Sequence, residues 1–367
     1  MHNLARWKIR SVKPYVPGKP IEELTRELGI KGEIIKLASN ENPLGPSPKA
    51  MEMVSRYIKE LNLYPDDSAY SLTKKIAEMN GLSTDEVILG NGSVEIMQMI
   101  DLAFVNPGES IVTSEKSFSL YKIIGDIVGA RVIETPMKDG KIDLNLILEG
   151  IKEDTKVVFI DNPTNPMGTL CPKDEVEDFM KRVPEDVIVV WDEAYYEYAR
   201  GEHFKETIDY VKQGRNVIVL RTFSKVYGLA GLRLGYAFAK KEIIDALGRT
   251  RLPFNVNTMA QIAAYYALED TEHVRKSVEM NSKGLEYLYE EFSKMNLKFY
   301  RSWGNFILVD LGINSDKPYN FLLKKGIIVR PVKNYSLPTC LRITVGTPSQ
   351  NQKLVEGLKE FLEHGYS

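Results

Sequence analysis

Residues 216–240 read NVIVLRTFSKVYGLAGLRLGYAFAK and contain two strand-like runs joined by a short loop. The first run, residues 216–223, ends just before Lys225, and the second, residues 234–240, directly follows Arg233. Continuous apolar and β-branched runs of this kind indicate strands that are buried on both faces of a sheet. Two cations therefore lie between two buried strands, and the loop that carries them is too short to contain a crossover helix.

Similar apolar runs precede this stretch at regular intervals. They are EVILG (86–90), SIVTS (110–114), ARVIET (130–135), KVVFID (156–161) and DVIVVWD (186–192). Helix-compatible segments, such as residues 93–105 and 173–183, lie between most of them. Strands that alternate with helices predict an α/β domain whose mostly parallel sheet is covered by helices on both faces.

The pattern changes after residue 250. A long amphipathic stretch, residues 258–295, is followed by three apolar runs and a final helix-like segment. The runs are NFILVDL (305–311), GIIVRP (326–331) and LRITVGT (341–347). This order predicts a smaller α+β domain. The expected division is an N-terminal segment (1–40) that packs on the small domain, a large α/β domain (41–250) and the small domain (251–367).

Composition excludes several classes of function. The 367 residues carry a formal net charge of -2, with both signs spread along the chain, so no basic footprint for nucleic acid is expected. Cys171 and Cys340 lie far apart, which argues against a disulfide framework or a zinc site and favours a reducing compartment. We find no signal-peptide core and no membrane-length apolar run, and four histidines make a metal site unexpected. A cytoplasmic protein without metal, membrane or nucleic-acid partners is therefore expected.

Chemically useful side chains follow four of the predicted strands. Ligands of open α/β sheets bind beyond the carboxyl ends of the strands. Lys225 follows one strand, and partial burial there would lower its pKa and make it a nucleophile toward carbonyls; alone, it could equally be a surface lysine. Asp192 ends another strand, where its carboxylate could pair with a protonated pyridine nitrogen or cap a helix.

The remaining strand ends offer hydrogen-bond donors. Asn165 and Tyr195 could donate to a phenolate oxygen, although NPTNP (162–166) also suits a plain turn. Gly92 and Ser93 open a predicted helix and could present N–H groups to a phosphate. Thr222, Ser224 and Arg233 could complete that phosphate site, and the apolar, glycine-rich flanks of Arg233 favour its burial.

Three stretches together resemble the pyridoxal-phosphate-dependent aminotransferases of fold type I. They are DNPTNPMG (161–168), WDEAYYEY (191–198) and RTFSKVYGLAGLRLGYAFA (221–239). Further stretches along the whole chain resemble the histidinol-phosphate aminotransferase family. They include KLASNENPLGPSPKA (36–50), LYPDDSAYSLTKKIA (63–77), LGNGSVEIMQM (89–99), PFNVNTMAQIAA (253–264) and IIVRPVKNYSLPTCLRITVGTP (327–348), together with PYVPGKPIEEL (14–24).

The resemblance implies a pyridoxal 5'-phosphate cofactor and a role for each matching residue. Lys225 binds the cofactor as a Schiff base and moves the substrate proton, and Asp192 pairs with the pyridine nitrogen. The 3-oxygen is held by Asn165 and Tyr195, and Phe118 stacks on the ring. The phosphate is held by Gly92, Ser93, Thr222, Ser224 and Arg233.

The resemblance also assigns residues to the substrate and to a second subunit. Tyr64 reaches the cofactor phosphate of the other subunit, which implies a homodimer with shared active sites. Arg342 binds the substrate anion, and Arg330 and Tyr15 handle a substrate phosphate; on its own, Arg330 could form only a rim salt bridge. Val94 stands where many relatives carry an acidic residue, which bears on substrate choice.

The implied activity is a ping-pong transfer of the amino group between L-glutamate and L-histidinol phosphate, with 2-oxoglutarate and imidazole acetol phosphate as the oxo partners. An aromatic amino-acid aminotransferase and a threonine-phosphate decarboxylase remain alternatives on the same scaffold. A cofactor-binding transcription regulator would need an added DNA-binding domain. A nicotinamide dehydrogenase is disfavoured because GLAGLRLG (228–235) lacks the G-x-G-x-x-G spacing and precedes a strand.

Overall fold

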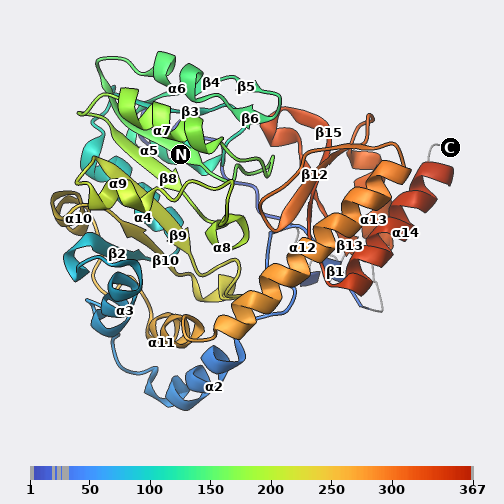
Figure 1. Cartoon of the computed structure of the whole chain (residues 1–367), viewed down its shortest axis with the longest axis horizontal. Helices are drawn as coiled ribbons and strands as arrows, with labels where there is room; N and C mark the ends of the chain where they lie inside the picture. Colours follow the sequence, from blue (N-terminus) through green and yellow to red (C-terminus); the bar gives the residue numbers. More distant parts are fainter. Residues whose placement is uncertain (1–3, 19–20, 23–25, 27–32, 365–367) are drawn as a thin grey trace.

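The computed structural model describes residues 4–18, 21–22, 26 and 33–364 of the chain. Parts of the predicted N-terminal segment (1–40) therefore lie outside the described residues. Within the described part, the strands form four sheets, of which the two larger ones, with seven and four strands, have their own cores; the long helix α12 (Thr271–Lys294) runs between these two (Figure 1). No helix of the described part is long and apolar enough to cross a lipid bilayer.

The larger sheet has seven strands in the order β2-β10-β9-β8-β7-β3-β4. The strands β9, β8, β7, β3 and β4 are parallel, and β10 runs antiparallel to both of its neighbours. Each strand coincides with one of the apolar runs, so the predicted α/β sheet is confirmed. The strands are β2 (Val87–Gly90), β3 (Ser110–Ser114), β4 (Arg131–Thr135), β7 (Thr155–Asp161), β8 (Ile188–Asp192), β9 (Val217–Thr222) and β10 (Gly235–Phe238).

Helices cover both faces of this sheet, because alternate strand residues point to opposite sides. In β8, Val189 and Trp191 belong to one core, whereas Ile188 and Val190 belong to the other. The second core is closed by α4 (Ser93–Phe104), α5 (Leu120–Val128) and α10 (Lys241–Gly248). The first is closed by α3 (Tyr70–Asn80), α6 (Leu144–Gly150), α7 (Lys173–Arg182), α9 (Ile208–Lys212) and α11 (Thr258–Ala267).

The C-terminal part folds around a smaller antiparallel sheet in the order β11-β12-β15-β14. The predicted run 326–331 divides between two sheets: β13 pairs in parallel with β1, and β14 pairs with β15. The domain boundaries at residues 40 and 250 stay a prediction. The elements are β1 (Ile35–Lys36), β11 (Lys298–Phe299), β12 (Phe306–Asp310), α13 (Asp316–Lys324), β13 (Ile327–Ile328), β14 (Arg330–Val332), β15 (Leu337–Thr344) and α14 (Pro348–His364).

Short elements complete the described chain. They are η1 (Trp7–Arg10), α2 (Pro48–Tyr57), η2 (Ile58–Glu60), η3 (Thr84–Glu86), β5 (Met137–Lys138), β6 (Lys141–Ile142), α8 (Tyr196–Ala199), η4 (Ala230–Leu232) and η5 (Lys333–Tyr335). The amphipathic stretch 258–295 forms two helices, because the Asp270 side chain accepts a hydrogen bond from the His273 amide and caps the start of α12.

Candidate active site

A cavity of about 440 Å³ lies where β7, β8 and β9 end at their carboxyl termini. The carboxyl ends of neighbouring parallel strands meet at one edge of a sheet, so the residues that follow them converge. The structure brings together most of the predicted site residues around this cavity. Those that line it are Tyr15, Gly92, Ser93, Phe118, Asn165, Asp192, Tyr195, Thr222, Ser224, Lys225 and Arg233.

Lys225 lies in the tight loop after β9, where its Nζ donates to the carbonyl oxygen of Ser39 at 3.4 Å. Burial lowers the pKa of Lys225 to about 8, and the nearby Arg342 guanidinium adds to this effect. Glu41 and Asp192 act in the opposite direction. A lysine that loses its proton so close to neutral pH can attack a carbonyl carbon.

Asp192 ends β8 with a side chain that is only 4% exposed. Its Oδ2 accepts a hydrogen bond from the Tyr121 hydroxyl at 2.7 Å, and its Oδ1 accepts one from the Ala194 amide at 3.1 Å. Burial raises the pKa of Asp192 to about 6, although both hydrogen bonds and Lys225 oppose that shift. A buried carboxylate held in this way is suited to a cationic partner such as a protonated ring nitrogen.

Asn165 and Tyr195 present two hydrogen-bond donors to the same cavity. Asn165 uses its Oδ1 to accept from Arg342 Nη1 at 2.6 Å, which leaves its Nδ2 to donate. The Tyr195 hydroxyl accepts from Asn40 Nδ2 at 2.8 Å, and burial raises the pKa of Tyr195 so that it keeps its proton. The pair can therefore donate to a single phenolate oxygen.

The start of α4 forms an anion-binding cradle. Gly92 has a φ of 79°, and a Cβ at this position would lie 2.5 Å from Arg233 Nη2. Only glycine lets the guanidinium approach the first turn of α4, where the N–H groups from Ser93 onward have no helical partner. Thr222 and Ser224 border the same side; the Thr222 hydroxyl accepts from the Ser224 amide at 3.1 Å.

Arg233 corrects one expectation from the sequence. Its glycine-rich flanks favour burial, but the side chain is exposed. The physical reason lies in the backbone: Arg233 ends η4 with a left-handed φ of 58°, which turns its side chain away from the core toward the open cavity. Its Nη1 donates to the Ala230 carbonyl oxygen at 3.1 Å.

Arg342 and Arg330 are direct neighbours across β14 and β15. Arg342 is 8% exposed; its Nη2 donates to the Ala38 carbonyl oxygen at 2.8 Å, and its Nε is buried without a hydrogen-bond partner among the described residues. Arg330 donates to the carbonyl oxygen of Val16, next to Tyr15 at the cavity mouth. Neither arginine lines the cavity, but Arg342 bonds the lining residue Asn165, whereas Arg330 bonds the backbone next to Tyr15.

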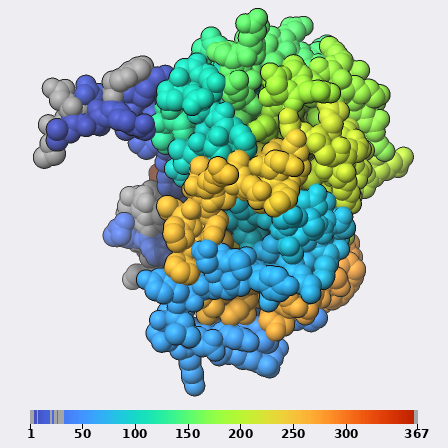
Figure 2. Space-filling view, turned by 90° about the vertical axis from the view of Figure 1, so that its left-hand side faces the viewer, coloured from blue at the N-terminus to red at the C-terminus, as the bar shows by residue number. Residues whose placement is uncertain are grey.

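Three predicted site residues do not line this cavity: Arg330 and Arg342, described above, and Tyr64. The side chain of Tyr64 is 82% exposed, and its ring stacks on Phe254 with centroids 4.7 Å apart. Figure 2 shows the blue segment after α2 beside the gold segment near residue 250, on one outer face of the molecule. Val94, the position that departs from the acidic pattern, does line the cavity.

Sequence reasoning missed three polar residues of the site. Tyr121 bonds Asp192, Asn40 bonds Tyr195, and Asp161 lines the cavity one strand away from Asp192. Tyr121 looks like a core residue of an amphipathic helix, so no local signal separates it from its neighbours. Asp161 could have been found, because it ends an apolar run just as Asp192 does.

The fold and this site define a class of enzyme. The sequence model of the family described as aminotransferase class I and II matches residues 32–358, and the chain belongs to this family. A histidinol-phosphate aminotransferase from Moorella thermoacetica is 46% identical over 97% of this chain and 92% of its own length.

Two further relatives carry the same name. One from Akkermansia muciniphila is 46% identical over 99% of both chains. The crystal structure of histidinol-phosphate aminotransferase from Sinorhizobium meliloti in complex with pyridoxal-5'-phosphate superposes with a TM-score of 0.88 at 26% identity, and covers 97% of each chain. The fold predicted for the type I class is therefore confirmed.

The residues of the cavity fit pyridoxal phosphate, the cofactor that this family implies. The glycine cradle beside Arg233 suits a phosphate, because a side chain at residue 92 would fill it. Asp192 offers the buried carboxylate that a ring nitrogen needs, and Lys225 offers an amine of lowered pKa. Asn165 and Tyr195 supply two donors for the ring oxygen.

Proposed function

We propose that this protein is a pyridoxal-phosphate-dependent aminotransferase that exchanges an amino group between L-glutamate and L-histidinol phosphate, a step of histidine biosynthesis in the cytoplasm. The observation that carries the proposal is that Lys225 and Asp192 line one cavity, while Arg342 lies behind it, bonded to Asn165 and close enough to lower the pKa of Lys225. The near full-length similarity to histidinol-phosphate aminotransferases supports the choice of substrate.

Lys225 has two tasks in this reaction. Its neutral amine would hold the cofactor through the cofactor's aldehyde carbon, with water as the leaving group. When not bonded to the cofactor, the same amine would take the proton from the substrate Cα and return it later. A pKa near 8 suits both tasks. The neutral amine is present often enough to act as a base, and the ammonium form is acidic enough to give the proton back.

The other residues of the cavity hold the reacting groups in place. Bound pyridoxal phosphate would supply an electron sink when the Cα–H bond breaks. Asp192 would keep the ring nitrogen protonated, and the hydroxyl of Tyr121 holds the carboxylate of Asp192 in its orientation. Asn165 and Tyr195 would bind the ring oxygen, Phe118 would cover the ring, and the phosphate would lie in the cradle of Gly92, Ser93, Thr222, Ser224 and Arg233.

The two arginines provide for two different substrates. Glutamate presents a carboxylate in one half-reaction, and histidinol phosphate presents a phosphate in the other. A guanidinium group can bind either anion through two parallel hydrogen bonds. The unpartnered Nε of Arg342 is available for such a bond, and Arg330, with Tyr15 nearby, extends the positive charge toward the cavity mouth.

An amino-acceptor panel with glutamate as the donor tests this choice of substrate. We expect rapid turnover of imidazole acetol phosphate and slow turnover of phenylpyruvate. The opposite order would identify an aromatic amino-acid aminotransferase instead. Release of carbon dioxide from threonine phosphate, without transfer of its amino group, would identify a decarboxylase.

The enzyme acts as a homodimer in which Tyr64 completes the phosphate site of the partner subunit. The support is a patch of exposed apolar side chains around Tyr64, on a face where a soluble monomer would expose few of them. The exposed apolar residues of the segment after α2 and of the segment near residue 250 are Ile58, Leu61, Leu63, Tyr64, Leu252 and Phe254, of which Tyr64 and Phe254 stack on each other.

Complementation between two inactive variants tests the shared site. Lys225→Ala removes the lysine of a subunit's own site, and Tyr64→Ala removes the tyrosine that it supplies to the partner's site. A hybrid dimer of the two variants therefore contains one intact site. Co-expression should therefore restore about a quarter of the wild-type activity if subunits pair at random. Activity no higher than that of the separate variants would show that Tyr64 serves its own subunit or none.

A further inference from the structure

Asp161 is a second buried carboxylate at the edge of the active-site cavity. It is 3% exposed and ends β7, where it pairs in register with Asp192 of the neighbouring strand β8. Side chains that are paired in register on parallel strands project to the same side of the sheet. The two carboxyl groups therefore lie side by side, and both line the cavity.

One oxygen of Asp161 joins two separate segments of the site. Asp161 Oδ2 accepts hydrogen bonds from the backbone amide of Asn165 at 2.7 Å and from that of Phe118 at 3.2 Å. Phe118 precedes α5, whereas Asn165 lies in the loop after β7. The other oxygen, Oδ1, is buried and has no hydrogen-bond partner among the described residues.

The burial of Asp161 disfavours the charged form of its carboxyl group. Burial raises the pKa of Asp161 to about 7, and the negative charge of Asp192 adds to the shift, while the Asn165 amide opposes it. The Ser117 hydroxyl also lowers the pKa of this carboxyl, and the ionisable side chains of Tyr121 and Cys171, which interact with it, carry no positive charge. A carboxyl whose pKa is raised by folding destabilises the native state increasingly as the pH rises through that pKa.

Asp161 lines the cavity, and one of its oxygens bonds two segments that carry predicted cofactor-binding residues, which indicates a functional role. We propose that Asp161 is a positioning residue for the cofactor, which fixes the ring-covering Phe118 and the oxygen-binding Asn165 through a single carboxylate oxygen. This inference rests on the proposed function. A negatively charged acceptor holds an N–H group more firmly than a neutral one does, so the charge of Asp161 maintains the spacing of the two segments.

The variant Asp161→Asn separates positioning from stability. Asparagine keeps the shape and one acceptor oxygen but removes the charge. At pH 8, above the pKa of both carboxyl groups, the variant apoprotein should melt at the same temperature as the wild type or higher. Its dissociation constant for pyridoxal phosphate, measured by quenching of tryptophan fluorescence, should nevertheless rise about tenfold.

Thr164→Val is the matched control. Thr164 lies in the same buried loop and donates through its hydroxyl to the backbone carbonyl oxygen of Asp161, but it does not touch the carboxylate. We expect this variant to lower the melting temperature and to leave cofactor affinity near the wild-type value. Asp161→Ser, which removes the charge and shortens the side chain, should weaken cofactor binding at least as much as Asp161→Asn.

A pH titration of the visible absorbance is a further test. If Asp161 had only a structural role, its substitution would leave the midpoint of this titration unchanged. Removing a nearby negative charge disfavours the protonated form of the Lys225-bound cofactor, so the midpoint should shift to lower pH in Asp161→Asn and stay in place in Thr164→Val.

The inference would be overturned if Asp161→Asn bound the cofactor as tightly as the wild type. It would also be overturned if the loss of affinity came with a lower melting temperature, as in a misfolded protein. A wild-type protein that does not bind pyridoxal phosphate would overturn the proposed function itself, and this result is distinct from either of the others.

Discussion

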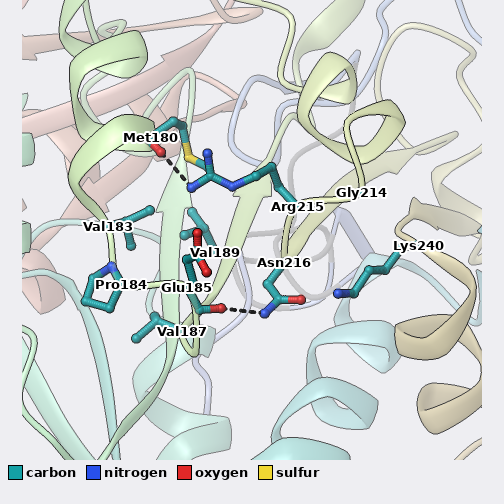
Figure 3. A pocket seen from close by; sticks show the side chains of 10 residues that line it. All are labelled: Met180, Val183, Pro184, Glu185, Val187, Val189, Gly214, Arg215, Asn216 and Lys240. Atoms are coloured by element: carbon teal, nitrogen blue, oxygen red, sulfur yellow. Dashed lines mark hydrogen bonds between the residues drawn. The ribbon is translucent and has the colours of Figure 1, made fainter.

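The seven-stranded sheet has a cavity at each end of its central strands, and the two cavities differ in kind. The cavity at the carboxyl ends has a volume of about 440 Å³, and the one at the amino ends of β8 and β9 has a volume of about 220 Å³. Both contain cations and a carboxyl side chain: Arg215, Lys240 and Glu185 line the smaller one (Figure 3). Charge alone therefore does not distinguish them.

The hydrogen bonds distinguish the two cavities. In the smaller one, Arg215 donates to the Met180 carbonyl oxygen at 2.8 Å, and Asn216 donates to the Glu185 carbonyl oxygen at 2.6 Å (Figure 3). Both side chains therefore donate to backbone carbonyl oxygens. In the larger one, side chains bond the backbone too, but polar side chains also bond one another, as Tyr121 and Asp192 do, and the lining residue Asp161 has a buried oxygen without a partner among the described residues. Bonds between side chains, together with an unpartnered polar atom in the cavity wall, are the features that separate the larger cavity from the smaller one.

Lys225→Ala should have the largest effect of any substitution in the two cavities. Lys225 is the one lysine among the described residues that line the cavity, so its loss should lower kcat by about 10⁴-fold. Borohydride should fix the cofactor covalently to the wild-type protein but not to the variant. Steady-state kinetics and the mass of the reduced protein check this expectation, and a variant that still retains the cofactor covalently after reduction would contradict the assignment of Lys225.

Arg342→Lys should come next. Lysine keeps the positive charge but cannot form two parallel hydrogen bonds, so kcat/KM should fall about 10- to 100-fold for glutamate. The matched variant Arg330→Lys should have a smaller effect on glutamate, because Arg330 lies at the edge of the site. Equal losses in the two variants would remove the distinction between the inner and outer arginine.

The capture of cofactor by the apoprotein should depend on pH in a defined direction. The neutral amine of Lys225 is the nucleophile, and burial beside Arg342 lowers its pKa to about 8. The rate of incorporation should therefore rise with pH and reach half of its maximum near pH 8, rather than near the ordinary lysine value of about 10.4. Stopped-flow absorbance measures this rate, and a midpoint close to the ordinary value would contradict the burial of Lys225.

Arg215→Met, in the smaller cavity, should have the smallest effect. The substitution removes one hydrogen bond to the backbone, so the free energy of unfolding should fall by about 1 kcal/mol. The value of kcat/KM should stay within about twofold of the wild type. Urea unfolding and the standard assay measure both quantities, and a large loss of activity would show that the two ends of the sheet are functionally linked.

The strands were predictable because each is a continuous apolar run. The buried stretch DVIVVWD gives β8 almost residue for residue, and so does KVVFID for β7. The position of β10 between β2 and β9 was not predictable, because pairing depends on packing between segments far apart in the chain. Nothing in residues 234–240 alone indicates an antiparallel strand.

Single side chains of the site were predictable where they follow a strand, as Asp192, Asn165 and Lys225 do. The partners of these residues were not, since Tyr121 reaches Asp192 from a helix 71 positions away in sequence. The burial expected for Arg233 was wrong for a related reason. Apolar, glycine-rich flanks indicate a tight loop, but they do not give the direction of the side chains within it. That direction depends on the left-handed backbone conformation of Arg233 itself.

Helix α12 affects how the protein unfolds. Ser277, near its start, accepts a hydrogen bond from Asn42, which also bonds the carbonyl oxygen of Val226 beside Lys225. Its later turns place Leu288 and Phe292 in the core of the smaller sheet. The rod of 24 residues, about 36 Å long, is thus anchored in both halves. Heating should melt the halves in one cooperative transition, and neither half should survive as a stable fragment after proteolysis within this helix.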